Sequence, residues 1–152
     1  MNISFTDHLT AEDYTMLRRS AEWPVPHPQQ VAQALKNSAL IVVAKDGEAT
    51  VGMARLVSDS GYVFLIVDVV VLPAYQRNGI GRAMMDRVMK YILGTLQQDY
   101  CIQIDLMSAP GKEDFYRSFG FVERSCEGYG SGMSLRITGQ CNSTPSDTGE
   151  QT

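Results

Sequence analysis

Six residues in the middle of the chain combine the residue types that bind phosphate. Gln76-Arg77-Asn78-Gly79-Ile80-Gly81 lies between a predicted strand and a predicted long helix. The first N–H groups of a helix have no partner within it, and the helix dipole adds positive potential there. Gly79 and Gly81 let the backbone approach an anion, and Arg77 and Arg82 add charge. The two glycines alone are equally typical of a plain turn, so the context decides.

Two common phosphate loops do not match this segment. A nucleotide P-loop continues with Lys and then Ser or Thr after its last glycine, whereas Gly81 is followed by Arg82 and Ala83. A dinucleotide fold has Gly-x-Gly-x-x-Gly after its first strand, whereas the strand before this loop is the fourth that we predict. The segment is therefore neither of these two sites.

The first half of the chain predicts two short helices and an antiparallel meander. Thr10 is a capping residue for a helix of about ten residues that must end near Trp23, because prolines follow at 24, 26 and 28. Apolar spacing predicts a second helix over Gln29–Lys36. Alternating or continuous apolar runs separated by turn residues predict four strands: Ile3–Phe5, Ala39–Ala44, Thr50–Val57 and Tyr62–Leu72.

The second half predicts a long helix over Gly79–Leu96, followed by a buried strand over Cys101–Met107. Strand, helix, strand in that order implies a parallel crossover between the fourth and fifth strands. A short helix over Lys112–Phe119 and two closing strands, Phe121–Arg124 and Met133–Ile137, complete the pattern. We therefore expect an α+β domain over residues 1–138, with a mixed six- or seven-stranded sheet and four helices. Residues 139–152, almost free of apolar side chains, are expected to be disordered.

Composition excludes several classes of protein. The chain has 152 residues, of which 44% are hydrophobic, which suits one globular domain. Its net charge of −4 argues against nucleic acid as a partner. The longest apolar run, residues 63–72, is half of the ~20 residues that cross a bilayer, so no membrane association is expected. Three isolated cysteines predict neither disulfides nor a metal site, and favour a cytoplasmic setting.

Asp68 interrupts the apolar run of the fourth strand. A carboxylate in such a strand costs several kcal/mol unless it is paired or hydrogen-bonded. Three roles are consistent with it: a catalytic base acting through water, a contact to a cationic amine, or a structural partner of Arg55 or of backbone N–H groups.

The loop, taken with its surroundings, resembles the signature of the GNAT superfamily of acetyl-CoA-dependent N-acetyltransferases, Gln/Arg-x-x-Gly-x-Gly/Ala. The similarity extends from Val69 through Pro73 to Gly81, and a second motif of the family resembles Asp114-Phe115-Tyr116-Arg117-Ser118-Phe119-Gly120-Phe121. It covers about residues 3–138, and the two motifs together are specific. The resemblance implies the GNAT fold and acetyl-CoA as the acetyl donor, with no metal.

The resemblance also implies where the cofactor lies. The fourth strand of this family separates from the next parallel strand, and the gap admits pantetheine. Backbone groups of the strand then pair with the pantetheine amides, and loop N–H groups bind the pyrophosphate. The cofactor-binding residues implied are Val69, Val70, Val71, Gln76, Arg77, Asn78, Gly79, Ile80, Gly81, Arg82 and Tyr116.

Tyr116 is the proton donor that the resemblance implies, because in families with Phe-Tyr-x-x-x-Gly-Phe the tyrosine lies beside the CoA sulfur. A phenol can protonate a departing thiolate. The alternative is a core aromatic between Phe115 and Phe119. Trp23 and Tyr14 either line the acceptor pocket, as the segment joining the first two helices often does in this family, or simply pack.

The function predicted is transfer of an acetyl group from acetyl-CoA to a primary amine, of a small molecule in the first instance, by direct attack in a ternary complex. Tyr116 and Asp68 are the candidate catalytic residues. The alternatives are a protein or peptide N-acetyltransferase and a non-catalytic acetyl-CoA-binding regulatory domain. Family habit makes a homodimer an expectation too.

Overall fold

The computed structural model describes residues 1–125, 127–128 and 130–135. The chain divides into two compact units, Met1–Met107 and the part that begins at Ser108. None of the helices in the described residues is both long and apolar enough to cross a membrane.

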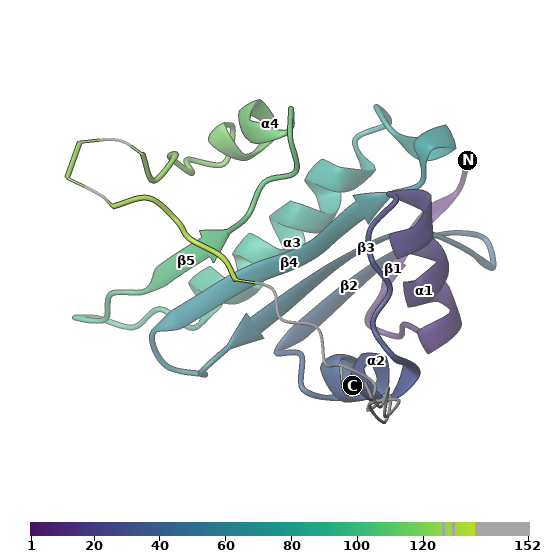
Figure 1. Ribbon diagram of the computed structural model, residues 1–152, viewed down its shortest axis with the longest axis horizontal. Helices are drawn as coiled ribbons and strands as arrows, with labels where there is room; N and C mark the ends of the chain where they lie inside the picture. Colours follow the sequence, from purple (N-terminus) through teal and green to yellow (C-terminus); the bar gives the residue numbers. More distant parts are fainter. Residues whose placement is uncertain (126, 129, 136–152) are drawn as a thin grey trace, which may run out of the picture. The chain divides into compact units, whose positions relative to one another are not determined.

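Five strands of the first unit form one mixed sheet whose spatial order follows the chain (Figure 1). Neighbours from β1 to β4 pair antiparallel, and β4 pairs with β5 in parallel. The predicted crossover between the fourth and fifth strands is therefore confirmed. The strands are β1 (Ile3–Thr6), β2 (Leu40–Asp46), β3 (Ala49–Ser58), β4 (Val63–Val71) and β5 (Gln103–Leu106).

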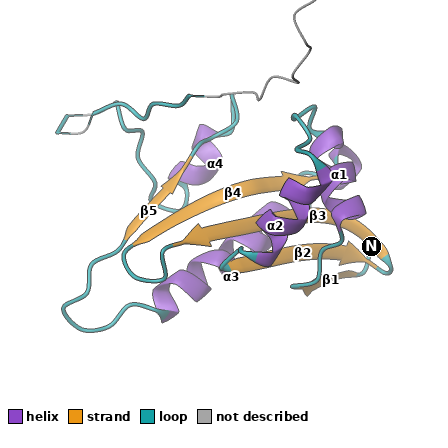
Figure 2. Ribbon diagram, turned by 60° about the horizontal axis from the view of Figure 1, so that its bottom comes forward, coloured by secondary structure: helices purple, strands orange, loops and turns teal. Residues whose placement is uncertain are grey.

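Helices cover both faces of this sheet, with α1 (Ala11–Ser20) and α2 (Pro28–Lys36) on one side and α3 (Ile80–Gly94) on the other (Figure 2). Alternation along the strands supplies both faces with apolar side chains. Met53 of β3 belongs to the core that contains residues of α1 and α2, whereas a side-chain atom at Gly52 would meet Met84 of α3. The core on the α1 and α2 side contains Leu9, Tyr14, Leu17, Val31, Val43, Met53 and Val70.

The two short helices begin where capping side chains place them. The Thr10 hydroxyl accepts a hydrogen bond from the Asp13 N–H at 3.1 Å. At the start of α2, His27 Nδ1 accepts from the Gln29 N–H at 3.2 Å, and the Gln30 side chain accepts from the His27 N–H at 3.1 Å. Such reciprocal capping satisfies N–H groups that a helix leaves without partners.

In its described residues, the second unit contains one short helix, α4 (Glu113–Arg117), and neither of the two expected closing strands. Phe121–Arg124 forms no strand, and neither do residues 133–135; residues 136–137 of the second expected strand, like the tail 139–152, lie outside the described part. A strand exists only where its backbone groups pair with a neighbour, and the described residues of these segments join no ladder. The sheet of the described residues therefore has five strands, and the expected count of six or seven is not confirmed.

Gly52 tests how closely α3 packs on the sheet. A Cβ at this position would lie 3.0 Å from the Val70 carbonyl oxygen and 3.3 Å from Met84 Cε. We expect Gly52→Ala to lower the free energy of unfolding by about 1–3 kcal/mol, the usual cost of overpacking. Gly94→Ala, in α3 with no atom within 4 Å of the added Cβ, is the control and should be neutral or slightly stabilising. Urea denaturation measures both; equal stabilities would contradict this packing.

Candidate active site

A 3₁₀ turn, Pro73–Tyr75, leads from the end of β4 into the glycine-containing loop. The N–H of Leu72 donates to the Val51 carbonyl at 2.9 Å and is the last bond of this edge of β4. Proline at 73 has no N–H with which to continue the ladder. The chain therefore leaves the sheet at Pro73, and α3 starts only seven residues later, at Ile80.

Two residues of the loop adopt left-handed backbone conformations. Arg77 has φ of 61° and Gly79 has φ of 77°. Only glycine adopts this conformation without steric cost, which explains its use at 79, the residue before α3. Alternation of left-handed and ordinary residues turns successive N–H groups toward one side, a geometry that binds anions.

The side-chain amides of the loop take up its carbonyl groups. Asn78 Nδ2 donates to the carbonyls of Tyr75 and Gln76 at 3.1 and 3.0 Å, and Gln76 Nε2 donates to the Val71 carbonyl at 3.0 Å. An anion is repelled by carbonyl oxygens and attracted by N–H groups. Gln76 and Asn78 therefore shape an anion site without having to touch the anion.

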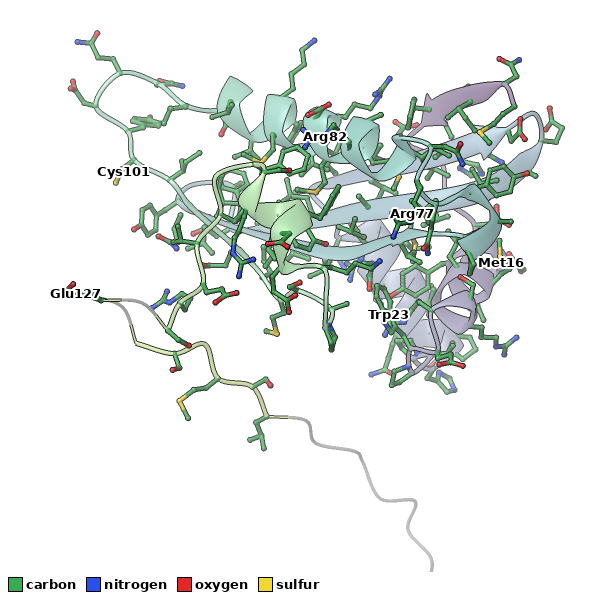
Figure 3. All side chains as sticks on the ribbon, turned by 90° about the horizontal axis from the view of Figure 1, so that it is seen from above. Met16, Trp23, Arg77, Arg82, Cys101 and Glu127 are labelled. Carbon is green, nitrogen blue, oxygen red and sulfur yellow. The ribbon has the colours of Figure 1, made fainter. Side chains whose placement is uncertain are left out.

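The donor set of the loop fits a pyrophosphate. No side chain caps α3, and within the described residues no hydrogen-bond partner is found for the N–H groups of Gly79, Ile80 and Gly81. Space beside Gly79 is open, since nothing lies within 4 Å of a Cβ built there. Arg77 and Arg82 are both exposed (Figure 3). The start of α3 thus offers free donors, positive potential and room for a large anion.

Among the described residues, one edge of β4 has no strand partner beyond Ile66. Parallel pairing with β5 runs from Val63 to Ile66 only, while pairing with β3 continues to Val71. Alternate residues of an antiparallel strand turn their backbone groups to opposite edges. Because Leu72 bonds to β3, Val70 also faces β3, and Val69 and Val71 face this open edge of β4 (Val67–Val71). The carbonyl of Val71 is already bonded by Gln76.

A bulge in β4 directly follows the last residue pairs with β5. Met53 and Arg55 of β3 oppose Val70 and Val67, so β4 has one more residue than β3 over this stretch. Asp68 lies in the bulge and has φ of 54°. A bulge bends a strand and redirects side chains, and aspartate tolerates left-handed geometry better than most residues.

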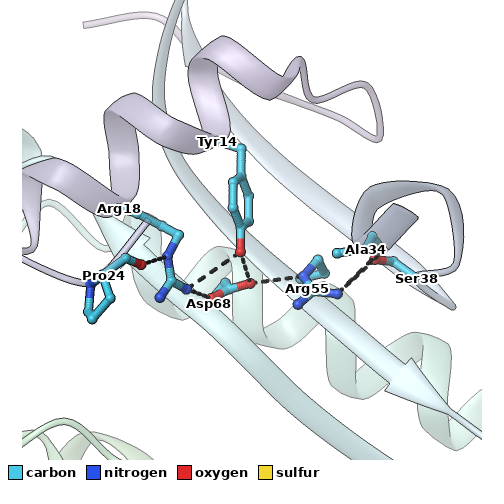
Figure 4. A network of polar contacts seen from close by, with 7 residues as sticks. All are labelled: Tyr14, Arg18, Pro24, Ala34, Ser38, Arg55 and Asp68. Atoms are coloured by element: carbon cyan, nitrogen blue, oxygen red, sulfur yellow. Dashed lines mark hydrogen bonds and ion pairs between the residues drawn. The ribbon is translucent and has the colours of Figure 1, made fainter. Parts of the chain in front are cut away.

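The bulge brings Asp68 into a polar cluster with Tyr14, Arg18 and Arg55, called here the Asp68 cluster (Figure 4). Asp68 Oδ1 accepts from Arg18 Nη1 at 2.5 Å. Asp68 Oδ2 accepts from Arg55 Nε at 2.9 Å and from the Tyr14 hydroxyl at 3.0 Å. Burial, and then the charge of Asp68, raise the pKa of the Tyr14 phenol, so it stays a donor. Asp68 therefore pairs with Arg55, as in the structural role that was one of the three predicted for it.

The two arginines fasten α1 and α2 to this point of the sheet. Arg18 Nε donates to the Pro24 carbonyl at 2.8 Å, in the segment between α1 and α2. Arg55 Nη1 donates to Ser38 Oγ at 3.2 Å, just beyond α2. Trp23 packs against the core and lies 5.5 Å from the Arg18 guanidinium, measured to the ring centroid. Tyr14 is buried, with its ring in the core and its hydroxyl on Asp68.

Arg18 is the member of the cluster that sequence reasoning missed. It is the fourth residue after Tyr14, and residues at this spacing share a face of a helix. Two features of the sequence could have indicated this ion pair. One is a charged residue beside the apolar face of a predicted helix, and the other is a lone carboxylate in an apolar strand.

Tyr116 belongs to the second unit, on α4. Its ring packs edge-on against Phe115, with centroids 5.0 Å apart, and against Phe121 at 6.3 Å. Burial raises the pKa of the Tyr116 phenol, which favours the protonated form that a proton donor needs. No group of His, Cys, Asp and Glu suited to hold a metal ion occurs among the described residues.

Replacing Asp68 with Asn tests the Asp68 cluster. The substitution leaves two guanidinium groups that are 15% and 13% exposed without a countercharge. We expect Asp68→Asn to lower the free energy of unfolding by about 3–5 kcal/mol, the cost of breaking a buried pair. Asp114→Asn is the matched control, because Asp114 pairs with Arg117 but is 95% exposed, and about 1 kcal/mol or less should be lost. Urea denaturation measures both losses. An equally small loss of unfolding free energy in the two variants would contradict a stabilising role of the cluster.

Comparisons with known proteins agree with this arrangement. The family model described as "Acetyltransferase (GNAT) domain" matches residues 37–123. The uncharacterized N-acetyltransferase ycf52 of Porphyra purpurea is 32% identical over 125 residues, which cover 80% of this chain and 70% of the relative. Histone acetyltransferase TAP1 of Glycine max is 31% identical over 110 residues, 65% of this chain and 46% of the relative.

A solved structure shares the fold. The crystal structure of a probable acetyltransferase from meticillin-resistant Staphylococcus aureus superposes with a TM-score of 0.81 at 28% identity, covering 90% of this chain and all of that one. The strand-to-loop signature and the match of the family model over more than half of the sequence point the same way. The chain therefore belongs to the GNAT family of N-acetyltransferases.

Proposed function

We propose that this protein transfers the acetyl group of acetyl-CoA to a primary amine of a small molecule. One observation carries the choice of donor: the uncapped start of α3 offers free N–H groups at Gly79, Ile80 and Gly81, next to the open edge of β4. A pyrophosphate suits the first feature, and an amide-bearing chain suits the second.

The residues that would hold acetyl-CoA lie on two neighbouring segments. The N–H groups of residues 77–82 would bind the pyrophosphate, with Arg77 and Arg82 adding charge and Gln76 and Asn78 holding the loop in shape. Backbone groups of Val69 and Val71 face the open edge and would pair with the pantetheine amides, with Val70 between them. Acetyl-CoA, when bound, supplies an acetyl thioester that an amine can attack.

Tyr116 is the residue to which we assign proton donation. The amine nitrogen would form a bond to the acetyl carbon as the carbon–sulfur bond breaks. The Tyr116 hydroxyl would give its proton to the thiolate and would regain one from the nitrogen, directly or through water. A phenol whose pKa is raised by burial holds that proton at neutral pH. The role of Asp68 as a base acting through water stays a prediction. Its contacts with Arg18 and Arg55 favour the structural alternative, because both oxygens already accept hydrogen bonds from cations.

A protein acceptor is the second candidate, because one relative is named a histone acetyltransferase. The chain matches less than half the length of that relative, so more than half of the relative has no counterpart in the matched region. Release of free CoA thiol from a panel of amines, amino acids, polyamines, aminoglycosides and lysine peptides separates the two candidates. CoA binding without transfer to any acceptor would favour a regulatory domain instead.

The setting and assembly of the protein also remain proposals. We propose a cytoplasmic setting from the isolated cysteines, of which Cys101 is free and exposed. A homodimer is proposed from family habit, and sedimentation velocity measures it.

Gly79 provides a test of the cofactor site with a matched control. Gly79 and Gly47 both have left-handed backbones, with φ of 77° and 58°, and neither has an atom within 4 Å of an added Cβ. Alanine therefore costs a similar backbone strain at either position, roughly 1–2 kcal/mol. We expect Gly79→Ala to weaken CoA binding tenfold or more, because its methyl group enters the anion site. Gly47→Ala, in the turn between β2 and β3, should leave the affinity unchanged. Isothermal titration calorimetry measures both affinities. Equal affinities in the two variants would contradict pyrophosphate binding at this loop.

Tyr116→Phe tests the proton donor. We expect kcat to fall by about 10²- to 10⁴-fold with little change in the KM for acetyl-CoA, since the aromatic ring is retained. Tyr62→Phe, which changes an exposed tyrosine, should leave kcat unaltered. Because the pKa of Tyr116 is raised, the phenol should stay protonated below pH of about 10. The pH profile of the wild-type kcat should therefore show no decrease from its ionisation in that range. Unchanged turnover in Tyr116→Phe with a responsive amine would rule out the assignment.

A further inference from the structure

The Asp68 cluster holds more positive than negative charge. One carboxylate, Asp68, is shared by two guanidinium groups, Arg18 and Arg55, so the cluster has a net charge of +1. The other hydrogen-bond partners of both arginines are neutral: the hydroxyls of Tyr14 and Ser38 and the carbonyls of Pro24 and Ala34. No second carboxylate of the described residues contacts either arginine.

This surplus charge is poorly hydrated. The side chains of Arg18, Arg55 and Asp68 are 15%, 13% and 7% exposed. A charge removed from water is costly unless it is paired and hydrogen-bonded. An ordinary structural ion pair would match one arginine to one carboxylate and would leave no surplus charge.

Each guanidinium also has a donor nitrogen to spare. Arg18 uses Nε and Nη1, and Arg55 uses Nε and Nη1, while Nη2 of each has no hydrogen-bond partner among the described residues. Figure 4 shows the two guanidinium groups on either side of the Asp68 carboxylate. A guanidinium nitrogen that is left free suits an anion with several oxygens, since the planar guanidinium matches carboxylate and phosphate oxygens.

The cluster lies where an acceptor would need recognition. Asp68 is in the bulge, at the open edge of β4 that the proposed function assigns to the cofactor. Trp23, beside Arg18, belongs to the segment between α1 and α2 and is only partly buried. An anionic group on the acceptor would thus meet Arg18 and Arg55 close to the proposed line of the cofactor.

We infer that the acceptor amine carries a carboxylate or phosphate group, which Arg18 and Arg55 bind through their free nitrogens while Asp68 holds both side chains in place. This inference rests on the proposed function, because the anion belongs to the amine that is acetylated. The same surplus charge disfavours basic acceptors such as lysine-rich peptides.

Matched pairs of amines test the inference by steady-state kinetics. The ω-amino acids glycine, β-alanine, 4-aminobutyrate and 6-aminohexanoate are compared with their amides, and O-phosphoethanolamine with ethanolamine. We expect the acidic member of at least one pair to have a kcat/KM more than tenfold above its neutral partner. The chain length of the best pair reports the spacing of amine and anion, and the two series distinguish carboxylate from phosphate.

Arg18→Gln should lower that ratio tenfold or more, because it removes charge-assisted hydrogen bonds to the anion, which only the acidic member of each pair carries. Arg55→Lys, which keeps the charge but loses the planar fork, is the second variant if Arg18→Gln fails to fold. Arg87→Gln is the control, because Arg87 lies over the Phe5 ring, outside the cluster, and it should keep the wild-type ratio.

Two results would overturn the inference: neutral amines or a lysine-rich peptide as better substrates in every series, or an unchanged ratio in a folded arginine variant. If no amine is acetylated, the proposed function fails, and calorimetric titration of the same acids in the presence of CoA decides the anion site separately. Binding that is weakened in Arg18→Gln supports the site, and no binding, or equal binding, refutes it.

Discussion

The separation of β4 from β5 is the constraint on which the rest of the site depends. Parallel pairing stops at Ile66, and the bulge at Asp68 follows two residues later. A bulge bends its strand and leaves backbone groups unpaired. From this one irregularity come an open edge at Val67–Val71 and the side-chain direction that takes Asp68 to α1. The anion loop then begins where β4 ends, so the two proposed cofactor contacts lie on consecutive segments.

Charge at the bulge links the fold to specificity. Asp68 is stabilised because arginines from α1 and β3 reach it together with the Tyr14 hydroxyl. Those arginines also hold the segment between α1 and α2 and the residue just beyond α2. The segment between α1 and α2, which we propose as a wall of the acceptor site, is therefore fastened to the bulge. A cluster with surplus positive charge is both an anchor and, as we infer, a means of selecting anionic acceptors.

Local patterns in the sequence predicted most of the first unit and the loop. Apolar periodicity and caps such as Thr10 predict the helices. Pro73 predicts the end of β4, and Gly79 predicts the start of α3. Pairing between distant segments was harder to predict. Phe121–Arg124 has strand-like composition yet joins no ladder, because strand formation depends on a partner and not on propensity alone. Arg18 was missed for the same reason, since its partner Asp68 is fifty residues away.

The central claim is that acetyl-CoA binds along the open edge of β4 and on the loop before α3. Hydrogen–deuterium exchange with and without CoA tests it residue by residue. We expect slower exchange on CoA binding at the amides of residues 77–82 and at Val69 and Val71, with β1 and β2 unchanged. Saturating CoA that leaves both segments unprotected, or that protects other parts of the chain alone, would contradict it.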